Sequence, residues 1–339
     1  MSHSISVTLD ALNNFSDALS SIITIIGTKL ANKKPDREHP YGHGRYEYLT
    51  SIGIALLILY AGISALIESI KKIIHPQVSQ YTWISVLVMI VAIISKIILG
   101  TYVKEKGNQV HSTSLIASGK DALFDAILTI SVLISIILNM IFHIQIEAYV
   151  GIIISLFIIK AGYEIISEMI SELLGARIGS DITNKVLDVI RQDEDVLGAY
   201  DLILHNYGPR YLMGSVHVEV SDTMTARQID TMTRRIMNSV ASQTGVMMSA
   251  IGVYSSNTLD QQLESMNQQI RTVVSQYEEV LQMHGLYIDR DKKTITFDVV
   301  TDFGLENKEL LKENITSQIQ DKYPEYQVEV IVEHDYSDI

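Results

Sequence analysis

Long apolar segments separated by short polar ones make up the first half of the chain. Five of these segments approach the length of about 20 residues that a helix needs to cross the hydrocarbon core of a bilayer. They span residues 4–30, 48–70, 81–102, 114–142 and 146–170. The pattern therefore predicts a polytopic α-helical membrane domain in residues 1–175.

The pattern changes at Arg177, where amphipathic helices and alternating, β-rich runs replace the apolar segments. The run Val196-Leu-Gly-Ala-Tyr-Asp-Leu has a counterpart in Val280-Leu-Gln-Met-His-Gly-Leu. In both copies a helix precedes two strands, which a second helix and a last strand follow. This order, α-β-β-α-β, predicts two ferredoxin-like α+β sandwiches in tandem, in residues 176–258 and 259–339. The closing helix and strand are expected at 225–243 and 248–254 in the first copy, and at 306–322 and 327–333 in the second.

Basic residues follow the first and third apolar segments, and Arg177 opens the polar half. They are Lys33, Lys34, Arg37, Arg45, Lys104 and Lys106. Because cytoplasmic loops carry an excess of Lys and Arg, we expect these loops and both C-terminal domains to be cytoplasmic. Five spans would then place the N-terminus outside, although no secretory signal precedes it. We therefore expect that a first helix is missing, through truncation or a wrongly assigned start codon.

Composition narrows the range of partners. The 339 residues include 26 Lys and Arg against 39 Asp and Glu, and the resulting net charge of −13 lies mostly in the second half. This acidity argues against nucleic acid as a partner and is compatible with the handling of cations. The chain has no cysteine, so any metal must be held by oxygen and imidazole ligands.

Two pairs of oxygen-bearing side chains lie inside the apolar segments. Asn13 and Asp17 occur in the first segment, and Asp121 and Asp125 in the fourth. A spacing of four puts both members of a pair on one face of a helix, one turn apart. An ionisable residue in a membrane span is costly and by default marks an ion path or a proton relay. Capping would explain Asn13 or Asp121 alone but not a carboxylate one turn deeper, so we expect a four-ligand cation site.

Two lysines in the apolar segments have simpler interpretations. Lys96, in the third segment, is expected to reach toward the membrane surface or to pair with a carboxylate. Lys160 and Glu164, four residues apart in the last segment, are expected to form an ion pair along one helix.

A second group of candidate ligands lies in the loop after the first apolar segment. Asp36, His39 and His43 could bind a cation there, with Gly42 and Gly44 allowing tight backbone turns. The alternative is a polar hairpin whose histidines cap helix ends. The residues alone do not decide between these two interpretations.

Three motifs stand out: DALNNFSDALSSI at 10–22, KPDREHPYGHGRYE at 34–47, and the YGP turn at 207–209 followed by SVHVEV at 215–220. Together they resemble the cation diffusion facilitator family of divalent metal/proton antiporters. The resemblance covers residues 4–257. It implies six spans, a dimer, and one cytoplasmic α-β-β-α-β domain, so this chain lacks the first span and carries an added second domain.

The resemblance assigns the transport site to Asn13, Asp17, Asp121 and Asp125. It also assigns a second metal site to Asp36, His39 and His43. Zinc-transporting members typically have a histidine where this chain has Asp121. A set of one amide and three carboxylates favours Mn²⁺ over Zn²⁺, with Fe²⁺ as a further alternative.

The metal site of the family's soluble domain is not expected here. His217 is present, and Asp230 falls where a ligand often lies. However, Tyr200 replaces an expected histidine, and residues 250–254 lack the expected histidine and aspartate. His217 is therefore interpreted as a strand histidine facing a polar surface.

The second copy carries its own polar residues at the ends of its strands. His284, His334 and Asp335 could converge there, but such residues are usually solvated. We therefore expect no metal site among these three.

The leading hypothesis is a transporter, not an enzyme, that exports a divalent cation, Mn²⁺ first and Zn²⁺ or Fe²⁺ as alternatives, by proton antiport. It would act as a multi-pass homodimer in the cell membrane. Its carboxylates would bind metal when ionised and take up protons in exchange. A rival hypothesis is a transport-deficient regulatory or interaction subunit, motivated by the missing span. A passive channel is less favoured, since nothing indicates a continuous polar pore lining.

Overall fold

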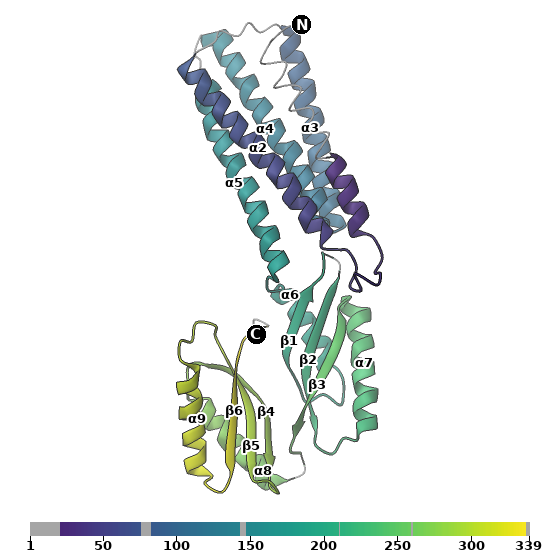
Figure 1. Cartoon of the computed structure of the whole chain (residues 1–339), viewed down its shortest axis with the longest axis vertical. Helices are drawn as coiled ribbons and strands as arrows, with labels where there is room; N and C mark the ends of the chain where they lie inside the picture. Colours follow the sequence, from purple (N-terminus) through teal and green to yellow (C-terminus); the bar gives the residue numbers. More distant parts are fainter. Residues whose placement is uncertain (1–20, 76–82, 143–146, 210, 259, 337–339) are drawn as a thin grey trace. The chain divides into compact units, whose positions relative to one another are not determined.

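The computed structural model describes residues 21–75, 83–142, 147–209, 211–258 and 260–336. The chain divides into two compact units. One consists of Met1–Ala176 together with Tyr207–Arg210, and the other of Arg177–Asn206 and Tyr211–Ile339. The first unit holds the long helices and the second holds both sheets (Figure 1).

The apolar segments of the first unit fold into helices. They are Ser21–Ala31, α2 (Tyr46–Ile74), α3 (Trp83–Gln109), α4 (Thr113–Phe142) and α5 (Glu147–Leu174). All predicted segments are thus helical wherever the structure describes them, and the first segment is described only from residue 21. Among the described residues, two helices are long and apolar enough to cross a membrane, Tyr46–Ile74 and Ala148–Leu174.

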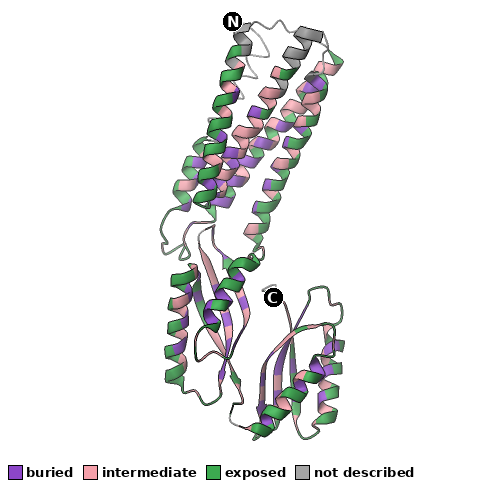
Figure 2. Ribbon diagram, turned by 180° about the vertical axis from the view of Figure 1, so that it is seen from behind, coloured by how far each residue is buried: buried purple, intermediate pink, exposed green. Residues whose placement is uncertain are grey.

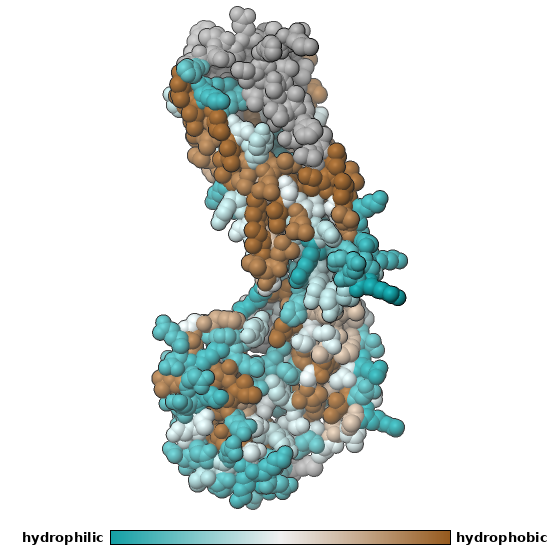
Figure 3. Space-filling model, in the orientation of Figure 1, coloured by the Kyte–Doolittle hydropathy of each residue, from teal (hydrophilic) through white to brown (hydrophobic). Residues whose placement is uncertain are grey.

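Apolar side chains lie both inside and outside this helical unit. A buried core between α2 and α5 includes Tyr48, Ile54, Ile58 and Ile158. Large apolar side chains also remain exposed, among them Leu56, Tyr60, Ile98 and Phe157, and Figure 3 shows apolar surface running along the helices. Exposed apolar surface of this extent indicates contact with lipid or protein rather than water.

Glycines bring α3 and α4 close together. A Cβ atom at Gly100 would lie 3.1 Å from the carbonyl oxygen of Gly119, and one at Gly119 would lie 2.6 Å from the amide nitrogen of Lys104. Small residues permit such an approach between membrane helices. Because Lys96 lies one turn before Gly100, the approach holds it against α4.

The second unit begins with a three-stranded sheet. Its elements are α6 (Ser180–Arg191), β1 (Gly198–Asn206), β2 (Leu212–Ser221), α7 (Ala226–Thr244) and β3 (Met247–Ser256). The central strand β2 pairs antiparallel with β1 and parallel with β3.

The same order of elements follows once more. It comprises α8 (Gln261–Val274), β4 (Val280–Asp289), β5 (Thr294–Thr301), α9 (Lys308–Lys322) and β6 (Gln327–His334). Here β5 is central, antiparallel to β4 and parallel to β6. The predicted order α-β-β-α-β is therefore found in both halves of the unit.

Periodic burial explains why these segments fold as they do. Helix α7 buries an apolar residue every fourth position, and α9 does the same, while β2 and the first half of β5 bury apolar residues at alternate positions. The buried residues are Met232, Ile236 and Val240 in α7, Leu311, Ile315 and Ile319 in α9, Val216, Val218 and Val220 in β2, and Ile295, Phe297 and Val299 in β5. Figure 2 shows this burial on the strands and on the inner faces of the helices. Each half therefore has its own core.

Candidate functional site

The carboxylates of the fourth apolar segment lie on α4. Asp121 and Asp125 are one turn apart, and both are half-buried. The carboxylate of Asp125 accepts a hydrogen bond from the Lys96 ammonium group on α3. Asn13 and Asp17 lie outside the described residues, so the four-ligand arrangement stays a prediction.

Lys96 pairs with a carboxylate, as expected from the sequence, and this pairing has a chemical consequence. The Asp125 side chain is 16% exposed and that of Lys96 is 30% exposed. A carboxylate in such surroundings is far more costly when it has no cationic partner. Lys96 therefore offsets the charge of Asp125 in this structure. The other predicted ion pair, Lys160 with Glu164, is also present, at 3.6 Å.

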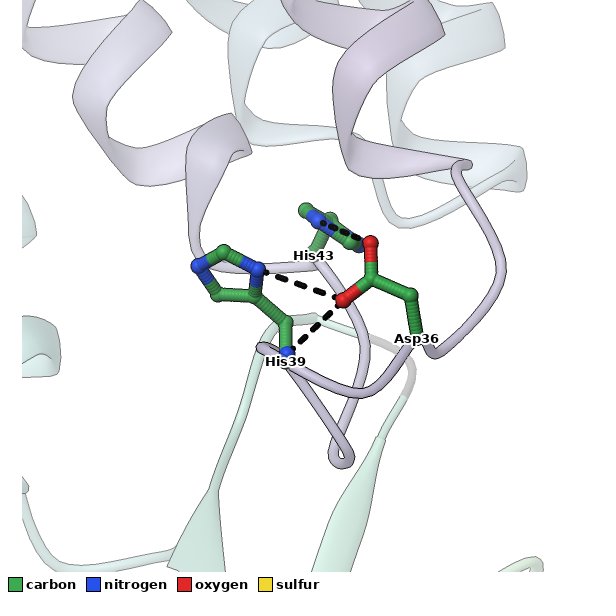
Figure 4. Close-up of side chains that lie close together, drawn as sticks. All are labelled: Asp36, His39 and His43. Carbon is green, nitrogen blue, oxygen red and sulfur yellow. Dashed lines mark hydrogen bonds and ion pairs between the residues drawn. The ribbon is translucent and has the colours of Figure 1, made fainter.

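Asp36, His39 and His43 converge in the loop before α2 (Figure 4). Each offers one ligand atom, and these atoms lie within 4.8 Å of one another. Nδ1 of His39 is 3.5 Å from Oδ1 of Asp36, and Nε2 of His43 is 3.6 Å from Oδ2. One carboxylate with two imidazoles is a donor set suited to borderline divalent cations.

The backbone of the loop turns to bring these residues together. Oδ1 of Asp36 accepts hydrogen bonds from the amides of Glu38, at 3.1 Å, and His39, at 2.8 Å. The Gly42 amide donates to the His39 carbonyl oxygen at 3.0 Å. Gly42 has φ of 85°, which glycine adopts without strain. This turn reverses the direction of the chain and brings His43 close to Asp36.

The positive charge of Lys33 favours the ionised form of Asp36, which is the form that binds a metal. The Lys33 ammonium lies 2.7 Å from its Oδ2. This hydrogen bond, followed by that from the His39 amide, holds the pKa of Asp36 well below its ordinary value. Asp36 is therefore ionised at neutral pH and carries the negative charge that a metal ligand needs.

The capping interpretation of the loop histidines finds little support. Helix α2 begins after Arg45 without a side-chain cap. His43 is buried, and among the described residues its Nδ1 has no hydrogen-bond partner. Within the described residues Nδ1 of His43 therefore caps no helix end, while Nε2 faces Asp36.

A turn distant in sequence packs on this loop within the first unit. A Cβ atom at Gly44 would lie 2.7 Å from the carbonyl oxygen of Tyr207. The Tyr207 ring lies 4.6 Å from that of Tyr41, and the Arg45 guanidinium lies 4.8 Å from the Tyr207 ring. The turn motif at 207–209 therefore contacts the histidine loop.

His217 and Asp230, the two candidate residues of the first sheet and its helix, lie in different ion pairs. His217 is a half-exposed strand histidine, and its Nδ1 is 2.9 Å from Oδ2 of Asp201. Asp230 pairs with Arg234 at 3.1 Å on α7. Asp230 therefore has a structural partner of its own on the helix.

His284 is not solvated, although the sequence analysis expected it to be. It is completely buried, with Nε2 3.0 Å from Oδ1 of Asp201. His334 instead stacks on Phe303, with ring centres 4.3 Å apart, and the Asp335 amide donates to the Thr301 carbonyl oxygen. The prediction that these residues are solvated is thus wrong for His284.

The structure also reveals polar residues that the sequence analysis missed. Asp201, Tyr254, Asp298 and Glu333 surround His284 and His217. Their spacing along the chain carries no ligand motif, since they come from four different strands. Only the burial of polar positions in otherwise alternating strands would have indicated them.

Comparisons with known proteins agree with the helical unit. Residues 1–174 match the cation efflux transmembrane domain. An uncharacterised transporter of Methanocaldococcus jannaschii is 30% identical over 230 residues, 67% of this chain and 80% of the relative. The manganese efflux system protein MneS of Bacillus subtilis is 27% identical over 218 residues, 64% of this chain and 73% of MneS. The cation-efflux pump FieF of Klebsiella pneumoniae is 19% identical over 225 residues, 65% of this chain and 73% of FieF. The chain therefore belongs to the cation efflux family, the cation diffusion facilitators.

Proposed function

We propose that the chain is a secondary transporter that exports a divalent cation, Mn²⁺ above others, from the cytoplasm in exchange for protons. The observation that carries this proposal is the pair Asp121 and Asp125, one turn apart on α4 and inside the matched transmembrane domain. Carboxylates within such a domain are costly unless they bind a cation or a proton.

The ligand set supports the choice of Mn²⁺. Asn13, Asp17, Asp121 and Asp125 offer only oxygen, and oxygen ligands suit Mn²⁺ better than Zn²⁺. The similarity to a protein named for manganese efflux points the same way. Zn²⁺ and Fe²⁺ are the alternatives for the same mechanism.

Lys96 gives the exchange a further step. When the site is ionised and faces the cytoplasm, the cation binds the carboxylates and displaces the Lys96 ammonium from Asp125. On the opposite side, protons neutralise carboxylates and release the cation. Lys96 then pairs with Asp125 again, so that no unpaired carboxylate remains in the apolar surroundings.

The rest of the chain fits a dimeric transporter with both soluble halves in the cytoplasm. The two halves share their order of elements and their strand arrangement, and we propose that they are ferredoxin-like duplicates. The first would hold two copies of the chain together. No step of this function requires an enzymatic activity.

Transport by the purified chain tests the proposal. In proteoliposomes with an acidic interior, the wild type should accumulate Mn²⁺, while Asp121→Asn and Asp125→Asn should not. Glu164→Gln is the matched control, because Glu164 is an exposed carboxylate of α5 that pairs with Lys160 on its own helix. Accumulation by Asp125→Asn at the wild-type rate would refute the site. A folded wild type without any flux would favour the regulatory subunit.

A further inference from the structure

His284 on β4 is a buried histidine whose polar atoms are not satisfied. Its side chain is 0% exposed. Its Nε2 lies 3.0 Å from Oδ1 of Asp201, yet neither ring nitrogen makes a well-directed hydrogen bond with the described residues. Buried polar groups nearly always have hydrogen-bond partners, so an exception requires an explanation such as an ion.

Asp201 is aimed at His284 by an irregularity of β1. The pairing of β1 with β2 shifts register between Tyr200 and Ile203, and Asp201 has φ of 53°. This left-handed conformation is unfavourable for a residue with a side chain and concentrates at functional sites. A bulge of this kind redirects a side chain, and here it directs a carboxylate that is only 11% exposed.

Glu333 on β6 lies close to both Asp201 and His284. One ligand atom from each of Asp201, His284 and Glu333 lies within 4.8 Å of the others. Asp298 adds a third carboxylate, joined to Asp201 through the Tyr254 hydroxyl at 2.7 and 2.9 Å. The group thus concentrates negative charge around an unsatisfied imidazole.

We propose that Asp201, His284 and Glu333, named here the inter-sheet cluster, bind a divalent transition-metal cation between the two sheets of the second unit. One imidazole nitrogen and two carboxylate oxygens suit Zn²⁺, Co²⁺, Fe²⁺ or Mn²⁺. A cation at this place satisfies His284 and offsets the crowded carboxylates. The proposal stands independently of transport.

The surroundings support binding of an ion. His217 Nδ1 contacts Oδ2 of Asp201 at 2.9 Å and leaves Oδ1 directed toward His284. Such outer hydrogen bonds fix the orientation of ligands. Asp201 also lines a surface pocket with Gln282 and His334, which gives the ion an entry route.

The cluster takes its ligands from both halves of the unit, since Asp201 belongs to the first sheet and the other two to the second. A hydrogen bond already joins the two halves: the Asn257 side chain accepts from the Ile288 amide at 2.9 Å. Gly285, with φ of 63°, leaves room for Tyr254, whose ring would lie 2.9 Å from an added Cβ. Metal binding would therefore hold the two halves together. Their association would then depend on the metal concentration.

Equilibrium dialysis of the full chain with Co²⁺ tests the cluster. The background variant carries Asp36→Ala, Asp121→Asn and Asp125→Asn, which weakens the other candidate sites. We expect it to bind about one Co²⁺ per chain, with the absorption of a nitrogen- and oxygen-ligated ion, and to unfold at a higher temperature when Co²⁺ is present. Adding His284→Gln or Glu333→Gln should weaken binding at least tenfold and remove the thermal shift.

Two substitutions serve as matched controls. His205→Gln changes an exposed histidine of β1, and Glu329→Gln an exposed glutamate of β6, and both should leave Co²⁺ binding unchanged. Glu333 is only half-buried, so its variant decides the question if His284→Gln fails to fold. Absence of Co²⁺ binding in the background chain, or equal affinity after Glu333→Gln, would overturn the proposal. The same holds if His284→Gln lowers stability alone, which would indicate a plain ion pair with Asp201.

Discussion

Gly119 of α4 lies directly against the backbone of Lys104 in α3: a Cβ atom at Gly119 would be 2.6 Å from the Lys104 amide nitrogen. Gly119→Ala therefore has to separate the two helices, because a backbone atom cannot turn aside as a side chain can. We expect a loss of stability of about 1–3 kcal/mol, together with slower Mn²⁺ transport as Lys96 moves from Asp125. Thermal unfolding in detergent and transport in proteoliposomes measure the two effects.

Gly53→Ala is the control for this substitution, since a Cβ there would have its nearest neighbour among the described residues, Cγ2 of Ile23, at 3.7 Å. That is an ordinary van der Waals distance. If both alanine variants were equally stable, close approach at Gly119 would not be what holds α3 against α4.

Lys96→Met should tighten Mn²⁺ binding. The substitution removes the ammonium group that occupies Asp125 while keeping a long apolar side chain. We expect the dissociation constant for Mn²⁺ to fall roughly tenfold, a change of about 1.4 kcal/mol. Direct binding measurements on the purified chain give this constant. Lys160→Met, which removes an exposed lysine of α5, should not alter it, and an unchanged constant in both variants would exclude competition by Lys96.

Asp121→His should shift preference from Mn²⁺ toward Zn²⁺. The change replaces a hard oxygen ligand by an imidazole nitrogen, which Zn²⁺ prefers. Competitive uptake of the two metals under a fixed proton gradient reports the ratio. An unaltered ratio would place selectivity outside α4, with the loop histidines as the next residues to test.

His39→Gln should weaken metal binding in the loop without a cost to folding, because this histidine is about half exposed. The variant keeps the backbone hydrogen bond to Asp36 and loses one of two imidazoles. Zn²⁺ binding to a chain that carries Asp121→Asn, Asp125→Asn and Glu333→Gln should become at least tenfold weaker. His75→Gln, an exposed histidine after α2, is the control, and equal effects of both changes would argue against a loop site.

Asp193→Asn should destabilise the second unit in a manner that depends on pH. Arg235 donates to both carboxylate oxygens of Asp193, at 2.5 and 2.7 Å, and lowers the pKa of Asp193. A lowered pKa adds stability above the unfolded value of about 3.9, and that stability is lost as pH falls through the folded value.

Thermal unfolding of this variant and of the wild type between pH 3 and 7 measures the effect. The unfolding temperature should differ by about 2 °C at pH 7, and the difference should shrink below about pH 4. Asp230→Asn breaks an exposed pair with Arg234 and should have little effect at any pH. A difference at pH 3 as large as that at pH 7 would exclude ionisation of Asp193 as its cause.

Local patterns were enough to predict much of the fold. Runs of apolar residues predicted α2, α4 and α5 to within about four residues at each end, but α3 continues seven residues beyond the predicted end at 102, and alternation predicted strands such as β5. The loop group Asp36, His39 and His43 was also found, because ligands close in sequence converge through a single turn. Each of these features depends on neighbours along the chain.

The inter-sheet cluster depends instead on long-range geometry. Asp201 and His284 meet only because two separately folded sheets pack together and because β1 changes register after Tyr200. Neither the packing of the two sheets nor the register shift can be recognised from the sequence around Asp201 and His284. The arrangement of Asn13 and Asp17 toward α4 lies outside the described residues and stays a prediction.

The pairing of Lys96 with Asp125 also bears on the electrical behaviour of the transporter. A lone carboxylate carried across the membrane field gains or loses about 2.3 kcal/mol per 100 mV. An ammonium and a carboxylate that move together contribute no net charge, so the return of the cation-free protein is electrically silent at this pair. In the exchange proposed above, the voltage across the membrane would then neither hasten nor hinder the return at this pair.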